Sequence, residues 1–83
     1  MSTQESEEMI REIEKRLKES LNVVSLKVSG SDSHYTIRVV SPDFEGKTSV
    51  SRQRMVFSAL GDLIMGANAP IHAIDYMETL LPE

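Results

Sequence analysis

The spacing of apolar residues changes twice along this chain, and this limits the folds it can adopt. From Met9 to Leu21 apolar residues recur every three or four positions, which predicts a helix with one buried face. From Val23 to Val40 they alternate with polar residues on either side of a turn-forming segment at 30–33, which predicts an antiparallel hairpin. The helical spacing returns over 49–64, and residues 71–77 are predicted to form a short third strand. The order helix, strand, strand, helix, strand predicts an α+β fold.

We expect the two helices to pack on one face of a three-stranded sheet. The third strand follows a helix, so it is predicted to run parallel to a hairpin strand and make the sheet mixed. A chain of 83 residues has room for one modest core, so we predict one small domain over residues 9–83. The acidic residues 1–8 are expected to be flexible, and residues 78–83 are expected to form a tail after the last strand.

Within the second predicted helix, one stripe of apolar side chains should face the core. Ser49 or Ser51 is expected to cap the amino end of this helix. The stripe comprises Val56, Ala59, Leu60, Leu63 and Ile64, with Val50 and Met55 near the entry. On the first helix, the pairs Glu12–Arg16 and Glu14–Lys18 have favourable i,i+4 spacing, and we expect them to form a solvated face.

Composition limits the chemistry that this chain can perform. It has no cysteine, so it supplies no disulfide and no thiolate nucleophile or ligand. No recognisable Ser/His/Asp spacing and no phosphate loop is present, so we do not expect an enzyme. No apolar run is long enough to span a membrane. Residues 1–8 carry three glutamates and no base, unlike a secretory signal or a mitochondrial presequence, which favours a cytoplasmic location.

Basic residues concentrate at the start of the second predicted helix, although the net charge is −4. Lys47, Arg52 and Arg54 could contact phosphates or carboxylates, or could simply form a solvated helix start. Direct RNA binding is not expected, because Gly46 belongs to no Gly-x-x-Gly clamp and Tyr35 offers almost no base-stacking platform.

The two histidines are the remaining candidates for chemistry. His72 stands at the start of the last predicted strand and His34 at the start of the second. Taken alone, an isolated histidine is more often a half-buried polar residue than a metal ligand. Both interpretations stay open on the residues themselves.

Three short segments, taken together, resemble the BolA family. They are Phe44-Glu45-Gly46-Lys47, then Ser51-Arg52-Gln53-Arg54-Met55-Val56, and finally Ile71-His72-Ala73, and the resemblance covers roughly Val23 to Ile74. It implies the same α+β architecture, similar to the type II KH fold, with a short extra helical turn before the last strand.

The resemblance also implies a function, that of an adaptor that binds a monothiol glutaredoxin and shares a 2Fe–2S cluster with it. His72 would be this chain's cluster ligand, with His34 as the candidate for a second ligand. The glutaredoxin cysteine and glutathione would supply the thiolates. The outcome would be iron–sulfur cluster trafficking or iron and redox regulation, with the second helix and last strand as the docking face. Two departures are visible. The loop at 30–33 lacks the histidine or cysteine that many members carry there, and Gln53 replaces the central histidine of an Arg-His-Arg sequence.

Two other functions are consistent with the same residues. The chain could be a DNA-binding transcriptional regulator of stress or cell shape, with Lys47, Arg52 and Arg54 on phosphates. It could also be a scaffold module that binds protein without metal. Alone, it is expected to be a monomer or a weak homodimer.

Overall fold

The computed structural model describes residues 2–83, with side chains from residue 5 onwards. Its elements follow the predicted order, including the short helical turn between the second helix and the last strand. They are α1 (Ser2–Ser20), β1 (Ser25–Ser31), β2 (His34–Val40), the 3-10 helix η1 (Pro42–Phe44), α2 (Ser49–Leu60), the 3-10 helix η2 (Gly61–Leu63) and β3 (Ala73–Leu80).

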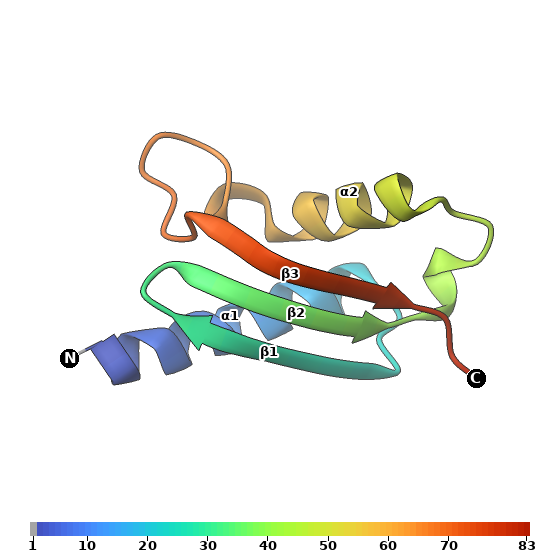
Figure 1. The fold of residues 1–83 in the computed structure, drawn as a ribbon, viewed down its shortest axis with the longest axis horizontal. Helices are drawn as coiled ribbons and strands as arrows, with labels where there is room; N and C mark the ends of the chain where they lie inside the picture. The colour runs from blue at the N-terminus through green and yellow to red at the C-terminus, as the bar shows by residue number, and fades with distance from the viewer. Residues whose placement is uncertain (1) are drawn as a thin grey trace.

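The three strands form one mixed sheet in the order β1-β2-β3, as predicted. β1 pairs antiparallel with β2, and β3 pairs parallel with β2 from His34 opposite Ala73 to Val40 opposite Leu80. The register shifts between Tyr35 and Thr36, which leaves Asp75 as an extra residue in β3. In Figure 1, α1 passes behind β1 and β2, and the other face of these strands is turned toward the viewer.

The core lies between the helices and that covered face of the sheet. Residues of β2 alternate strictly between buried and more exposed positions, as expected for a strand with one covered face. The buried apolar residues are Ile13, Leu17, Leu21, Tyr35, Ile37, Val39, Phe44, Val56, Ala59, Leu60, Leu63 and Ile71. α1, β2, η1, α2 and η2 each contribute at least one buried residue to this core. β1 and β3 contribute half-buried residues.

α1 begins at Ser2, earlier than the start at Met9 that apolar spacing predicted. The segment 2–8, which was expected to be flexible, is helical in the structure, and Ser6 within it is buried. The helix can extend this far because glutamate favours helices, and Glu5 in the first turn interacts favourably with the helix dipole. The apolar pattern missed this segment because, among its described side chains (residues 5–8), the one that is buried is the small polar Ser6.

The predicted stripe continues beyond the helix, at the buried Leu63 of η2 and the half-buried Ile64, and α2 itself confirms it at Val56, Ala59 and Leu60, which are all buried. Its cap is Thr48, whose Oγ1 accepts a hydrogen bond of 3.1 Å from the Ser51 amide, whereas Ser49 or Ser51 was predicted. The prediction of Val50 as a buried entry residue was wrong, because this side chain is 55% exposed in the first turn.

β3 extends to Leu80, so the first residues of the predicted acidic tail belong to the sheet. Glu78 pairs with Arg38 of β2, and their side chains form an ion pair of 3.4 Å on the exposed face. The Leu80 carbonyl accepts a hydrogen bond of 2.9 Å from the Ser41 amide. The parallel partner strand therefore continues the ladder past the point where the apolar pattern alone would end it.

The β1–β2 turn is strained, and this leads to a first prediction. Asp32 and Ser33 have φ angles of 54° and 71°, as in a type I′ turn, which usually contains glycine. Ser33→Gly should relieve about 1–2 kcal/mol of strain, partly offset by roughly 0.5–1 kcal/mol of glycine flexibility in the unfolded chain. We expect urea denaturation to show a net gain of about 0.5–1 kcal/mol. Ser29→Gly, in β1, should be destabilising, and equal losses for both variants would contradict the turn assignment.

Asp43 connects the end of α1 to η1 and leads to a pH-dependent prediction. Its carboxylate accepts hydrogen bonds from the backbone amide of Asn22 at 2.9 Å and from the Asn22 side chain at 3.0 Å. These bonds, the backbone one first, lower the pKa of Asp43 below its ordinary value of 3.8. Its stabilising contribution is therefore complete above that value and is lost as the pH falls through the lowered pKa.

The corresponding test is denaturation of Asp43→Asn and the unchanged protein between pH 7 and pH 2. We expect the variant to be less stable at neutral pH and the difference to narrow below about pH 4. Stability curves that stay parallel over the whole range would show that this carboxylate is not coupled to folding.

Candidate functional site

His72 lies just before β3. The start of β3 and the β1–β2 turn lie at the same end of the sheet (Figure 1). Its backbone amide donates a hydrogen bond of 2.9 Å to the Ser33 carbonyl, and the Ala73 amide donates to the same oxygen at 3.2 Å. Ile71, immediately before it, is only 1% exposed and fixes the chain against the core. The imidazole itself is exposed, and none of the hydrogen bonds among the described residues involves it. The backbone at His72 is thus fixed while its ring is open to a ligand.

A cavity of about 590 Å³ lies beside His72, between the first half of α1 and the β1–β2 turn. His72 and the buried Tyr35 form part of its wall. Its carboxylates are Glu5, Glu8 and Glu12 from α1 and Asp32 from the turn. The surroundings of His72 are therefore acidic.

His34 lies close to His72 in the strand register but faces another way. Its neighbour Tyr35 is buried under the helices, so His34 projects from the opposite, exposed face of the sheet. There its Nδ1 lies 3.1 Å from Oδ1 of Asp75, the extra residue of β3. His34 does not line the cavity beside His72. The structure thus places the backbones of the two histidines close together, but their rings do not lie on the same side of the sheet.

Within residues 2–83, no group of three or more histidine, cysteine or acidic side chains is arranged to hold a metal ion.

The three basic residues predicted as one binding group have different roles in the structure. Arg52 is half-buried, and it donates hydrogen bonds of 3.0 Å each to the carbonyls of Lys47 and Thr79. Its guanidinium lies 5.9 Å from the centre of the Phe44 ring, within cation–π range. Arg52 therefore connects the loop before α2 to β3. Lys47 and Arg54 remain exposed.

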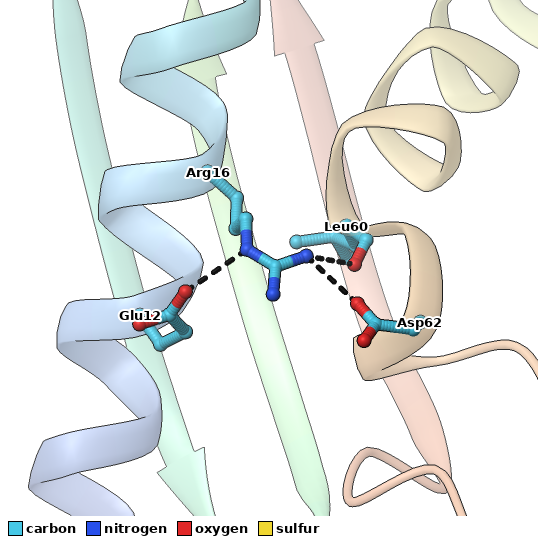
Figure 2. A network of polar contacts seen from close by, with 4 residues as sticks. All are labelled: Glu12, Arg16, Leu60 and Asp62. Carbon is cyan, nitrogen blue, oxygen red and sulfur yellow. Dashed lines mark hydrogen bonds and ion pairs between the residues drawn. The ribbon is translucent and has the colours of Figure 1, made fainter.

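Arg16 was expected on a solvated face, and this expectation was wrong. Figure 2 shows its guanidinium between α1 and the end of α2. Nε donates to Glu12 at 2.9 Å, and Nη1 donates to the Leu60 carbonyl at 3.1 Å and to Asp62 at 3.0 Å. The hydrogen bond to Asp62, followed by that to Glu12, raises the pKa of Arg16. Arg16 thus fixes the end of α2, from which the chain continues to His72.

Sequence reasoning missed this role because only half of the contact is local. The Glu12–Arg16 spacing is visible within one helix, but Asp62 and the Leu60 carbonyl are more than forty positions away. An acidic residue in the last turn of the predicted helix, Asp62, was the only signal, and many surface acids share it.

The fold and site define a small α+β domain with an exposed histidine before its last strand and acidic surroundings. The chain belongs to the BolA-like protein family, whose model matches residues 12–82. This confirms the family to which its motifs pointed.

Solved structures of the family confirm the fold. A Bol-like protein from Babesia bovis is 33% identical, with a TM-score of 0.73 over 88% of this chain and 84% of that one. The BolA domain of SufE1 from Arabidopsis thaliana is 25% identical, with a TM-score of 0.77 over 89% of this chain and 92% of that domain. The likeness to the type II KH fold stays a prediction.

Curated relatives differ in how much of their length is matched. An uncharacterised protein from Buchnera aphidicola (subsp. Schizaphis graminum) is 37% identical over 67 residues, 81% of each chain. BolA-like protein 1 from mouse is 39% identical over 46 residues, which are 55% of this chain and 31% of the mouse protein. The match to the mammalian relatives thus covers less than a third of their length.

Among the described residues, no helix has the length and apolar character needed to cross a bilayer.

Proposed function

We propose that this chain is a cytoplasmic, non-enzymatic adaptor that binds a monothiol glutaredoxin and shares a 2Fe–2S cluster with it. The complex would serve cluster trafficking or iron and redox regulation, and His72 would be this chain's ligand. One observation carries the proposal, namely an exposed imidazole on a fixed backbone in a chain that belongs to the BolA-like family.

The residues present fit a shared cluster better than one held by this chain alone. A 2Fe–2S cluster needs four ligands, usually thiolates, and this chain has no cysteine. His72 can offer one neutral nitrogen, so the glutaredoxin cysteine and glutathione would complete the set. A nitrogen ligand in place of a thiolate raises the reduction potential of such a cluster. The role of this chain is to bind the glutaredoxin and to orient the His72 nitrogen toward the cluster.

His34 is the weaker candidate for a second ligand. It projects from the exposed face of the sheet and its ring is engaged by Asp75 at 3.1 Å. Since His72 lines a cavity on the other side of that sheet end, we assign the ligand role to His72 alone.

The DNA-binding alternative receives no specific support. It requires Lys47, Arg52 and Arg54 to face phosphates together, but two N–H groups of Arg52 are used by backbone carbonyls. The net charge of −4 also opposes approach to a polyanion.

The test is to mix the protein with a cluster-loaded monothiol glutaredoxin and record visible absorption and circular dichroism. We expect a heterodimer whose cluster spectrum differs from that of the glutaredoxin alone. In His72→Ala this difference should be lost, because an iron ligand is removed. The matched control is His34→Ala, which removes the second imidazole and should leave the spectrum of the complex unchanged.

Each alternative result has a clear meaning. Binding without a spectral change would keep the partner and reject the shared cluster. Equal loss in both histidine variants would show that both imidazoles act as ligands. No complex at all would reject the adaptor function, and a salt-sensitive mobility shift of DNA would then favour the regulator.

A further inference from the structure

The cavity beside His72 holds more negative charge than its surroundings compensate. Glu5, Glu8 and Glu12 recur at three- and four-residue spacing, so they share one face of α1, and Asp32 approaches from the β1–β2 turn. Arg16 pairs with Glu12 at 2.9 Å, but the other three carboxylates form no ion pair with any described residue. No lysine or arginine of the described chain lines the cavity. Its field therefore attracts cations.

Tyr35 provides a second, independent observation. It is only 4% exposed and lines the cavity, yet its hydroxyl takes part in none of the hydrogen bonds among the described residues. No fully inaccessible polar side-chain atom in the described chain lacks a partner, and no described residue bonds to this hydroxyl, which is consistent with an opening to solvent at this point. We place that opening at the cavity, which Tyr35 lines. Polar groups in protein interiors are normally paired, so a phenol hydroxyl that no described residue engages, on a residue that lines the cavity, is available to a ligand.

The cavity's walls restrict what that ligand can be. Met9 and the Tyr35 ring give it apolar surfaces beside the carboxylates. An anion would be repelled, and a purely apolar group would desolvate the carboxylates without compensating them. A long apolar stem with a cationic end satisfies both parts, as the side chains of lysine and arginine do. A guanidinium can in addition contact the face of a tyrosine ring.

We infer that this cavity receives an arginine or lysine side chain from a partner protein. The basic group pairs with Glu5, Glu8 and Asp32 and donates to the Tyr35 hydroxyl. The volume of the cavity, about 590 Å³, is within the range of ligand pockets, so the cavity accommodates such a side chain together with flanking atoms. Because His72 lines the same cavity, we assign the basic residue to the glutaredoxin, and this assignment rests on the function proposed above.

Two matched double variants distinguish the effect of the cavity carboxylates from the effect of the net charge of the protein. Glu5→Gln with Glu8→Gln removes two cavity carboxylates and leaves Glu12, which pairs with Arg16, unchanged. Glu7→Gln with Glu45→Gln removes two exposed carboxylates that do not line the cavity. Both variants lose the same charge, so a difference between them reports position. Tyr35→Phe keeps the buried ring and removes only the hydroxyl.

The first arm titrates each protein calorimetrically with a capped oligo-arginine peptide at low ionic strength. We expect the cavity variant to bind roughly tenfold more weakly and the control variant less than about twofold more weakly. Tyr35→Phe should weaken binding by roughly threefold, since one hydrogen bond is lost. Equal weakening in the two double variants would show that only net charge matters, and would overturn the inference.

The second arm measures the affinity of the same variants for the cluster-loaded glutaredoxin. We expect the cavity variant to bind roughly tenfold more weakly, while the cluster spectrum of the complex that still forms is unchanged. Unchanged affinity in the cavity variant would overturn the assignment to glutaredoxin but leave the adaptor function intact. If the unmodified protein binds no glutaredoxin, the adaptor function fails, and the peptide arm alone decides whether the cavity receives a basic side chain.

Discussion

Replacing Phe44 by alanine is expected to lower the free energy of unfolding by about 3–5 kcal/mol. Phe44 lies in η1, outside the main helices and strands, yet it is fully buried and belongs to the core. Alanine would leave a cavity that the surrounding side chains cannot fill, and it would remove the ring beneath the Arg52 guanidinium. A domain of this size has roughly 4–12 kcal/mol of stability in total, so the variant should be partly unfolded at ambient temperature.

Urea denaturation followed by far-ultraviolet circular dichroism would measure this loss. Phe44→Leu is the matched control, because it retains most of the buried volume and should cost less than about 1.5 kcal/mol. If alanine were tolerated as well as leucine, then η1 would not be part of the cooperative core.

Gly30→Ala is expected to destabilise the domain by about 3 kcal/mol. Gly30 has a φ angle of 133°, which side chains rarely adopt. An added Cβ would also lie 2.3 Å from the His34 carbonyl oxygen and 2.7 Å from the Tyr35 Cα. Both are backbone atoms of the paired strand, so the hairpin itself would have to shift. That shift would move the turn whose Ser33 carbonyl binds the His72 backbone.

Gly46→Ala is the appropriate comparison for this experiment. Gly46 also has a positive φ angle, 74°, but an added Cβ would meet no atom within 4 Å. It should therefore cost only the backbone strain, about 1 kcal/mol. Thermal denaturation of both variants would distinguish the cost of backbone strain from the cost of the steric clash with β2. Equal melting temperatures would contradict the predicted clash.

Much of this fold could be predicted because the apolar pattern is local. The alternation in Tyr35, Ile37 and Val39 correctly predicted the covered face of β2, and the helical stripe correctly predicted the core residues of α2. The errors lie at the ends of elements, where partners distant in sequence decide the structure. Leu80 belongs to β3 because Val40 and Ser41 bind it, and no pattern within residues 78–83 could reveal that.

The site was only partly predictable for the same reason. The position of His72 before the last strand follows from the sequence, and its family motif singled it out. The separation of His34 from His72 depends on the alternation at Tyr35 and on the parallel register of β3, which only the structure supplies. The structural contacts of Arg52 and Arg16 could not be predicted because acceptors of each are backbone carbonyls on other elements. A carbonyl carries no signature of residue type.

The shared Ser33 carbonyl has a consequence for ligand exchange at His72. With two successive amides bound to one oxygen, at 2.9 and 3.2 Å, the backbone of His72 is immobilised and only the two side-chain torsions remain free. Little conformational entropy is then left to lose when the ring meets a ligand, because the backbone part of that loss is already incurred on folding. The reach of the imidazole is correspondingly short. An incoming group must come close to this end of the sheet, so the orientation of the docked molecule determines whether His72 can bind that group.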